Sequence, residues 1–258
     1  APQLLPLLQP YSQNAPILIV GCGNSAFSAD LYDAGYHNIV NVDYSGVVIS
    51  RMREQHGVLR PLMTWLEMDM TKMTFPIRED GDAPFDVVID KAALDAIMVD
   101  EKSVWDPAEE VVLAADATCR GVRQLIRGGR TALRATAAAA TAAAASDRPL
   151  SIEALAAAAA ALPSELPALS PGQPSPLPGL YVMISFMQPH FRTKYLFGTH
   201  ADRMEGLREE VHSAVSPAAA ALGYSPRYDW RLRYETIRLA DGGSFEHFLY
   251  IMYAGQAD

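Results

Sequence analysis

The sequence predicts an α/β fold: a Rossmann-like, doubly wound, mostly parallel seven-stranded sheet with a C-terminal antiparallel hairpin. Short apolar, β-branched runs alternate with helical patterns in the first half of the chain, which is typical of a parallel sheet covered by helices. A glycine turn follows the first of these runs. Near its end the chain has two strand-like runs on either side of ADGGS, a pattern that predicts a hairpin.

The first strand–helix–strand unit begins at Ile17. Ile17–Val20 is a β-branched run bounded by turn residues, which favours a buried strand. Ser25–Ala34 has apolar residues at helical spacing, and Gly35 follows it as a C-cap. Ile39–Val42 is the next predicted strand.

Two further strands complete the predicted parallel part. Ser45 can cap a helix that continues to His56. Met63–Met68 and Phe85–Ile89 are predicted as the third and fourth strands. Right-handed crossovers then bring the carboxyl ends of all these strands to one edge of the sheet. The last three strands end on acidic residues, namely Asp43, Asp69 and Asp90.

The second half of the chain is less uniform. Pro107–Arg127 is predicted as a helix, and the composition then turns to alanine and proline over 131–178. This segment has too few large apolar residues for a core, so we interpret it as an insertion within a single domain that covers 1–258. Leu180–Phe186 is predicted as a fifth strand and Asp202–Leu222 as an interrupted surface helix.

Composition limits the function classes. The formal charge of −9 argues against a general nucleic-acid binder, because phosphate neutralisation requires a basic face. Cys22 and Cys119 are too few for a disulfide framework, which favours a reducing, cytoplasmic compartment. We expect no signal peptide, no membrane span and no metal site, because no apolar run approaches about 20 residues and the histidines lack neighbours at ligand spacing.

The glycine turn is the first candidate site. Gly21, Gly23 and Ala26 match G-x-G-x-x-[G/A] after a strand and before a helix. Gly21 allows a tight turn, and Gly23 removes the side chain where a ligand would approach the backbone. The helix start beyond it favours negative charge. A turn without any ligand is the alternative interpretation.

Acidic residues at the next two strand ends narrow the range of possible ligands. Asp43 lies twenty residues after Gly23, where a carboxylate can accept both hydroxyls of a ribose. The spacing favours this role, although the same residue could also, or only, cap the next helix. Dinucleotides and S-adenosylmethionine both satisfy this pattern. Asp69 and Met70 suit an adenine ring, through the exocyclic amine and the ring face, unless Asp69 is only a turn residue.

The fourth strand end brings IDKAALD next to the glycine turn. Asp90, Lys91 and Asp95 then lie in the crevice where ligand and substrate meet in a doubly wound sheet. Asp90 and Asp95 are the candidates for accepting a substrate proton. A role in positioning is an equal alternative for both, and Asp95 could also be a surface acid of a helix.

Five motifs together resemble the class I S-adenosylmethionine-dependent methyltransferases. They are GCGNS, NVDYSGVVI, EMDMTKMTFP, FDVVIDKAALDA and PHFRT. The chain is most similar to the methyltransferase-like branch that methylates lysines of translation elongation factor 1-alpha. The resemblance covers roughly Ile17–Arg130 and Leu180–Gly255.

The resemblance implies S-adenosyl-L-methionine as the cofactor and a protein lysine as the methyl acceptor. The implied cofactor-binding residues are Gly21, Cys22, Gly23, Asn24, Asp43, Tyr44, Asp69, Met70, Asp90 and Lys91. The residues expected to line the substrate channel are His190, Phe191, Trp230 and Tyr234, with core or hairpin packing as the alternative for the last two.

Two other functions remain open. The same cofactor site could serve a methyltransferase for a small molecule or another protein side chain. A scaffold subunit with a methyltransferase fold is the third possibility. It is suggested by the insertion and by the sixteen residues before Ile17, which contain one aromatic residue where the family has a cofactor-covering segment.

Overall fold

The fold is that of a computed structural model. It describes residues 4–78, 82–100, 107–128, 177–205, 223–238 and 246–255. The predicted insertion, apart from its last two residues, lies outside the described residues. So do the ADGGS turn and most of the helix predicted over Asp202–Leu222.

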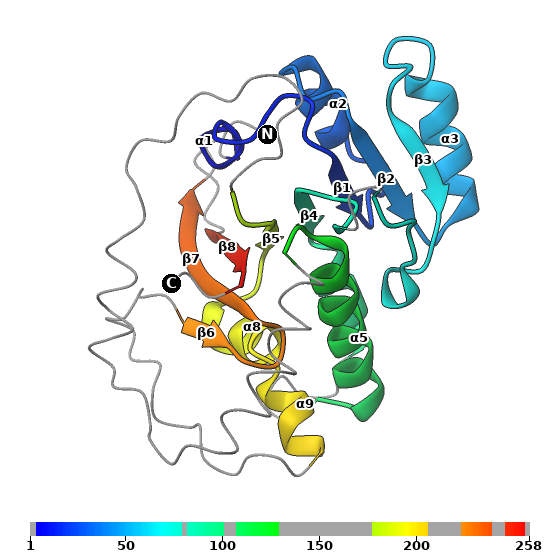
Figure 1. Ribbon diagram of the computed structural model, residues 1–258. Helices are drawn as coiled ribbons and strands as arrows, with labels where there is room; N and C mark the ends of the chain where they lie inside the picture. The colour runs from blue at the N-terminus through cyan, green and yellow to red at the C-terminus, as the bar shows by residue number, and fades with distance from the viewer. Residues whose placement is uncertain are drawn as a thin grey trace.

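The described strands form one mixed sheet, which confirms the predicted fold class (Figure 1). Their bounds are β1 Ile17–Val20, β2 Ile39–Asp43, β3 Thr64–Glu67, β4 Val87–Lys91, β5 Leu180–Ser185, β6 Gly223–Ser225, β7 Trp230–Arg238 and β8 Glu246–Ala254. The sheet has eight strands in the order β3-β2-β1-β4-β5-β8-β7-β6. The three-residue β6 is the strand that the sequence did not predict.

Strand directions follow the prediction. β1 to β5 are mutually parallel, whereas β8 runs antiparallel to β5 and β7 antiparallel to β8. The chain adds β2 and β3 on one side of β1, then returns to add β4 and β5 on the other side. β1 and β4 therefore flank the point where the strand order reverses, and such a point forms a ligand crevice at the carboxyl ends of the strands.

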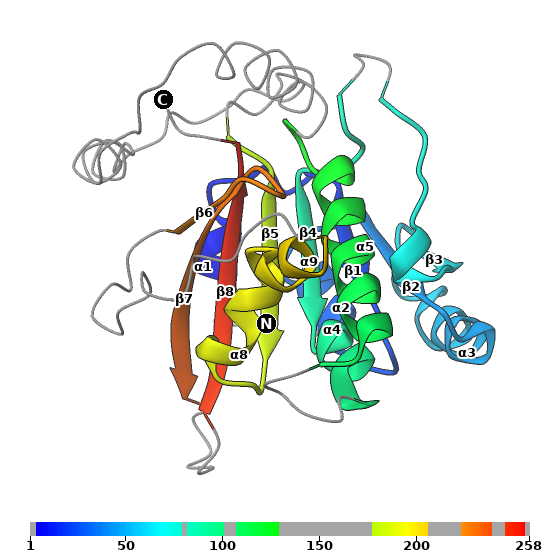
Figure 2. The same cartoon turned by 90° about the horizontal axis from the view of Figure 1, so that it is seen from below.

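Helices cover both faces of the sheet, and Figure 2 shows α5, α8 and α9 on one side with α1 and α2 on the other. Their bounds are α1 Leu5–Leu8, α2 Phe27–Asp33, α3 Gly46–His56, η1 Met70–Lys72, α4 Ala93–Ile97, η2 Met98–Asp100, α5 Glu109–Leu125, α8 Pro189–Leu196 and α9 Thr199–Met204. Ser45 caps α3 as predicted, since its hydroxyl accepts the N–H of Val48. Among the described helices, none has the length and apolar character needed to cross a bilayer.

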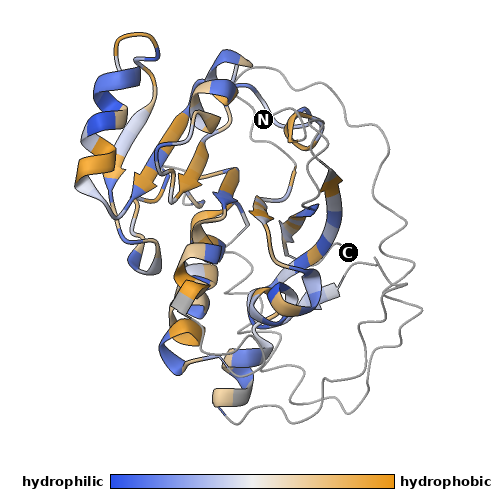
Figure 3. Ribbon diagram, turned by 180° about the vertical axis from the view of Figure 1, so that it is seen from behind, coloured by the Kyte–Doolittle hydropathy of each residue, from blue (hydrophilic) through white to orange (hydrophobic). Residues whose placement is uncertain are grey.

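The sheet separates two apolar cores. One contains Val20 and Tyr181 with residues of α5 and α8, and the other contains Ile19 and Val182 with residues of α1, α2 and α3. The central strands are accordingly apolar on both faces, whereas the second half of α3 is mostly hydrophilic (Figure 3). This pattern is expected for parallel strands buried between two helical layers.

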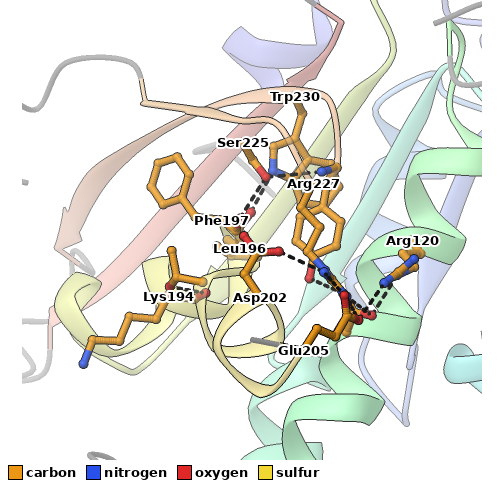
Figure 4. A network of polar contacts seen from close by, with 12 residues as sticks. Arg120, Lys194, Leu196, Phe197, Asp202, Glu205, Ser225, Arg227 and Trp230 are labelled. Atoms are coloured by element: carbon orange, nitrogen blue, oxygen red, sulfur yellow. Dashed lines mark hydrogen bonds and ion pairs between the residues drawn. The ribbon is translucent and has the colours of Figure 1, made fainter. Parts of the chain in front are cut away.

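A polar network fixes the C-terminal strands against the helices on one face (Figure 4). Arg227, before β7, pairs with Asp116 of α5 at 2.6 Å, with Asp202 of α9 at 2.9 Å and with Glu205 at 2.7 Å. Trp230 donates its indole N–H to the backbone carbonyl of Leu196 at 2.8 Å. Because the guanidinium is buried among three carboxylates, its charge is compensated where burial would otherwise be costly.

Candidate functional site at the carboxyl edge of the sheet

The glycine turn after β1 uses its two glycines for different reasons. Gly21 and Gly23 both have φ of +56°, a conformation that favours glycine. A Cβ on Gly21 would lie 2.3 Å from the Cβ of Ala93, so α4 packs directly against the turn. A Cβ on Gly23 would meet no atom within 4 Å, so this side of the turn faces open space. Gly23 is therefore the point where a ligand could approach the backbone.

Asp43 at the end of β2 holds this turn in place. Its Oδ2 accepts the N–H of Gly23 at 2.9 Å, and its Oδ1 accepts the N–H of Ser45 at 3.0 Å. The side chain is buried, at 7% exposed. Each carboxylate oxygen can accept a further hydrogen bond, so these contacts leave capacity for ribose hydroxyls. The link to Gly23 was not expected from the sequence, which suggested only a ribose ligand or a helix cap.

Cys22 lies between the two glycines and is buried. Its N–H donates to the carbonyl of Val42 at 3.0 Å, which joins the turn to β2. Burial, with a smaller contribution from Asp43, raises the pKa of the Cys22 thiol to about 12. The thiol is therefore neutral at physiological pH and is not a nucleophile.

Three residues predicted to hold the nucleoside lie at the ends of β2 and β3. Tyr44 is 82% exposed, immediately after Asp43. Asp69 is exposed and caps η1, accepting the N–H of Thr71 at 2.9 Å, and this bond lowers the pKa of Asp69. Met70 is partly buried and packs against the core. Asn24 is exposed beside the glycine turn.

Asp90, at the end of β4, is fully buried. Its carboxylate accepts the N–H groups of Ala93 at 2.7 Å and Leu94 at 3.1 Å, so it holds the first turn of α4. Burial raises the pKa of Asp90 to about 7. The adjacent Lys91 is half-buried and has no ion-pair partner among the described residues.

Asp95, a candidate proton acceptor, joins three elements through its carboxylate. Its carboxylate accepts the Ser185 hydroxyl at 2.7 Å, the Phe186 N–H at 3.0 Å and Nε of Arg192 at 2.8 Å. The ion pair is buried, with side-chain exposures of 3% for Arg192 and 13% for Asp95. These three donors occupy the carboxylate, which favours the role in positioning that was the alternative for Asp95. Asp95 therefore ties α4 to the end of β5 and to α8.

The predicted substrate-channel residues do not all lie together. His190 and Phe191 are on the first turn of α8, directly beyond β5, with ring centroids 3.9 Å apart. Tyr234 is half-buried and lies 6.1 Å from the ring of Tyr250. Tyr234 of β7 pairs with Tyr250 of β8, which in turn pairs with Met183 of β5. Met183 pairs with Asp90 of β4, so Tyr234 is level with Asp90 but lies three strands away.

The structure corrects the prediction for Trp230. This residue is fully buried, in contact with the rings of Tyr181 and Tyr228. It pairs with Ala254 at the first position of β7. Tyr253, the residue before Ala254 in β8, pairs with Leu180, the first residue of β5. Trp230 is therefore level with the start of β5. Trp230 therefore belongs to the core at the opposite edge of the sheet.

Sequence reasoning missed the partners of Asp95. Ser185 and Arg192 follow it by about ninety positions, and no spacing rule relates them. Arg192 does fall within PHFRT, so the motif marked the segment without indicating which side chain mattered. The aromatic pair of Phe186 and His247 was also missed, because the two residues come from different strands.

Comparisons with known proteins match part of this chain to methyltransferases. Residues 17–112 match a family model described as a methyltransferase domain. The mouse eEF1A lysine and N-terminal methyltransferase is 52% identical over 88 residues, which are 34% of this chain and 12% of that protein. The mouse EEF1A lysine methyltransferase 4 is 38% identical over 115 residues, which are 44% of this chain and 43% of that protein.

The chain thus covers less than half of either relative. Among solved structures, TrmN from Thermus thermophilus matches with a TM-score of 0.49 and 10% identity, over 98% of this chain and 47% of that one. Within the described part of the chain, no group of three or more His, Cys, Asp or Glu side chains is arranged to hold a metal ion.

Proposed function

Because residues 17–112 belong to the methyltransferase domain family, which indicates S-adenosylmethionine as the cofactor, we propose that this chain methylates a protein lysine. The observation that carries the proposal is the bond between Gly23 and Asp43, within the segment matched by that family. Relatives named for eEF1A lysine methylation support translation elongation factor 1-alpha as the substrate. We also propose that this methylation takes place in the cytoplasm.

The residues at the carboxyl edge fit the cofactor in the proposed arrangement. The methionine end would lie along Gly21–Gly23 and Asn24, where Gly23 leaves open space. Asp43 would accept the ribose hydroxyls with its remaining lone pairs, and Tyr44 would cover the ribose and adenine side. Asp69 and Met70 would hold the adenine. Asp90 would support the site from beneath by holding α4.

Lys91 is the one cation in this set. It lies beside Asp90 and lacks an ion-pair partner among the described residues. We assign it to the methionine end of the cofactor, where a carboxylate would compensate its charge. This assignment is consistent with the contact between Gly21 and α4, which brings the end of β4 next to the glycine turn.

The chemistry requires positioning more than acid–base catalysis. Methyl transfer from a sulfonium is an in-line displacement, so the protein has to align the attacking amine with the methyl carbon and the sulfur. The amine must lose its proton before it can attack. Asp90 and Asp95 are committed to α4, Ser185, Phe186 and Arg192, so their proposed roles are in holding the site.

The substrate is tested by incubating the chain with methyl-labelled cofactor and a cell extract. We expect labelled methyl-lysine in a protein band of elongation factor 1-alpha. The Gly23→Ala variant, which fills the open side of the turn, should give no label. Label found only in small molecules would reject the lysine proposal in favour of small-molecule methylation. A chain that does not bind the cofactor at all would favour a scaffold.

A further inference from the structure

Ala92 joins β4 to α4 in a backbone conformation that residues with a side chain rarely adopt. Its φ is +63° and its ψ is +17°, in the left-handed region. Within the described part of the chain, only Ala92 and Asp229 have a positive φ without being glycine. The Cβ of such a residue lies too close to its own backbone, so the conformation persists only where the surrounding contacts enforce it.

Three hydrogen bonds enforce it here. The N–H of Ala92 donates to the carbonyl of Ile184 at 2.9 Å, which extends the pairing between β4 and β5 by one residue. The carboxylate of Asp90 accepts the N–H groups of Ala93 at 2.7 Å and Leu94 at 3.1 Å. The chain is therefore extended as far as Ala92 and turns back directly after it.

Lys91 is held within this turn. The bond between the carboxylate of Asp90 and the N–H of Ala93 closes a short loop, in which Lys91 and Ala92 are the central residues. Lys91 also pairs with Ile184 of β5, so its backbone is fixed by the sheet on one side and by the turn on the other. The residue is half-buried, and part of it reaches solvent.

The loop lies beside the glycine turn. Val20, the residue before Gly21, pairs with Asp90, the residue before Lys91, so the two turns leave neighbouring strands at the same level. A Cβ on Gly21 would lie 2.3 Å from the Cβ of Ala93, which shows that the two turns are in contact. A ligand that lies along the glycine turn therefore has Lys91 as a neighbouring cation.

We propose that Ala92 is a positioning residue, whose left-handed conformation places Lys91 to bind the carboxylate at the methionine end of the cofactor. This inference rests on the assignment of Lys91 in the proposed function. A negative φ at Ala92 would rotate the chain before it relative to the chain after it, so Lys91 and Ala93 could not both keep their positions. The strain is thus retained where it serves the site.

Two ligands separate the ends of the cofactor in a calorimetric titration. S-Adenosylhomocysteine contains adenine, ribose, a thioether and the amino acid, whereas methylthioadenosine lacks the amino acid. Lys91→Ala should raise the Kd for S-adenosylhomocysteine about 10-fold or more, through the loss of a hydrogen bond between charged groups. Its Kd for methylthioadenosine should equal that of the wild-type chain.

Variants at position 92 test the turn. Ala92→Val should show the same pattern as Lys91→Ala, because a β-branched residue is strongly disfavoured at positive φ and the turn has to shift. Ala92→Gly should bind both ligands as the wild-type chain does, and its urea midpoint should not fall, since glycine adopts positive φ without strain. The conservative variant thus separates the conformation from the side chain.

A double variant tests whether the turn acts through Lys91. In Lys91→Ala combined with Ala92→Val, the Kd for S-adenosylhomocysteine should lie within about 2-fold of that of Lys91→Ala alone. Asp90→Asn opens the same loop without a change at position 92, because an NH₂ group replaces one of the two acceptor oxygens. It should also weaken S-adenosylhomocysteine more than methylthioadenosine, and it serves as the test if Ala92→Val does not fold.

Gly128→Val is the matched control. Gly128 has a φ of +76°, and a Cβ there would meet no atom within 4 Å, so the variant places valine under similar backbone strain. Ile126, two residues earlier, bridges to Phe85 ahead of β4, so Gly128 lies at the opposite edge of the sheet. The Kd values for both ligands should equal those of the wild-type chain.

Three results would overturn the inference alone. They are wild-type affinity for S-adenosylhomocysteine in folded Ala92→Val, equal losses for the two ligands, and losses that add in the double variant. Unchanged binding of S-adenosylhomocysteine by Lys91→Ala would instead overturn the assignment of Lys91, and the inference with it. Because every measurement here is an affinity, lysine methylation itself is decided separately, by the labelling experiment.

Discussion

The carboxylate of Asp43 accepts the backbone N–H of Gly23 across twenty positions of sequence, at 2.9 Å. This bond joins the end of β2 to the turn after β1. The two features that indicated a nucleoside cofactor are therefore one structural unit. A change at Asp43 should therefore alter the turn as well as any ribose contact. The separate roles of the two glycines in this turn can be distinguished by mutation.

Alanine at the two glycines should have different consequences. Gly21→Ala places a Cβ 2.3 Å from Ala93, so we expect a loss of about 2–4 kcal/mol in the free energy of unfolding from overpacking and the positive φ. Gly23→Ala meets no atom within 4 Å and should lose only about 1–2 kcal/mol, from its φ. Urea unfolding measures both, and equal losses would show that α4 does not pack on the turn as described.

Asp95→Asn should destabilise the chain strongly. It leaves the guanidinium of Arg192, with a side chain only 3% exposed, without a counter-charge. Removing one partner of a buried pair costs about 3–5 kcal/mol. Asp33→Asn is the control, because Asp33 is 57% exposed in its pair with Arg60 and its loss should destabilise the chain far less. Similar unfolding free energies for the two variants would contradict the role of Asp95 in joining α4 to α8.

The buried Asp90 predicts a pH dependence of stability. Burial raises its pKa from 3.8 to about 7 in the folded chain. The folded state therefore holds the proton more tightly than the unfolded state, and stability falls as pH rises from about 4 to about 7. Asp90→Asn removes this contribution, so the difference in unfolding free energy between variant and wild type should change by up to about 1.4 kcal/mol per pH unit in that window. A constant difference from pH 4 to pH 8 would show that Asp90 titrates normally.

The sequence was informative where local patterns determine structure. Ile17–Val20 and Ile39–Val42 are short β-branched runs ending at turn residues, so their strands and their common edge could be predicted. The candidate site residues Gly21 and Asp43 could be predicted from the same local patterns. The α/β class with a terminal hairpin was correct for this reason, although β6 is too short to give a pattern.

Contacts between distant segments could not be read from local patterns. Trp230 lies at the opposite edge because β7 begins there, and its direction depends on pairing with β8. Asp95 was placed near the end of β4 correctly, but its partners Ser185 and Arg192 become neighbours only when β5 and α8 pack against α4. Whether a carboxylate is free to react depends on packing between distant segments, which local sequence patterns do not reveal.

The most direct test of the account is a calorimetric titration of S-adenosylmethionine into the wild-type chain and the Asp43→Asn variant. Asparagine can replace only one of the two acceptors that Gly23 and Ser45 now use, and it removes the charge that favours the ribose hydroxyls. A lost charge-assisted bond of about 1.5–3 kcal/mol corresponds to a roughly 10- to 150-fold higher Kd. We expect saturable binding to wild type and this weaker Kd in a folded variant. No binding to wild type, or an equal Kd for both, would contradict it.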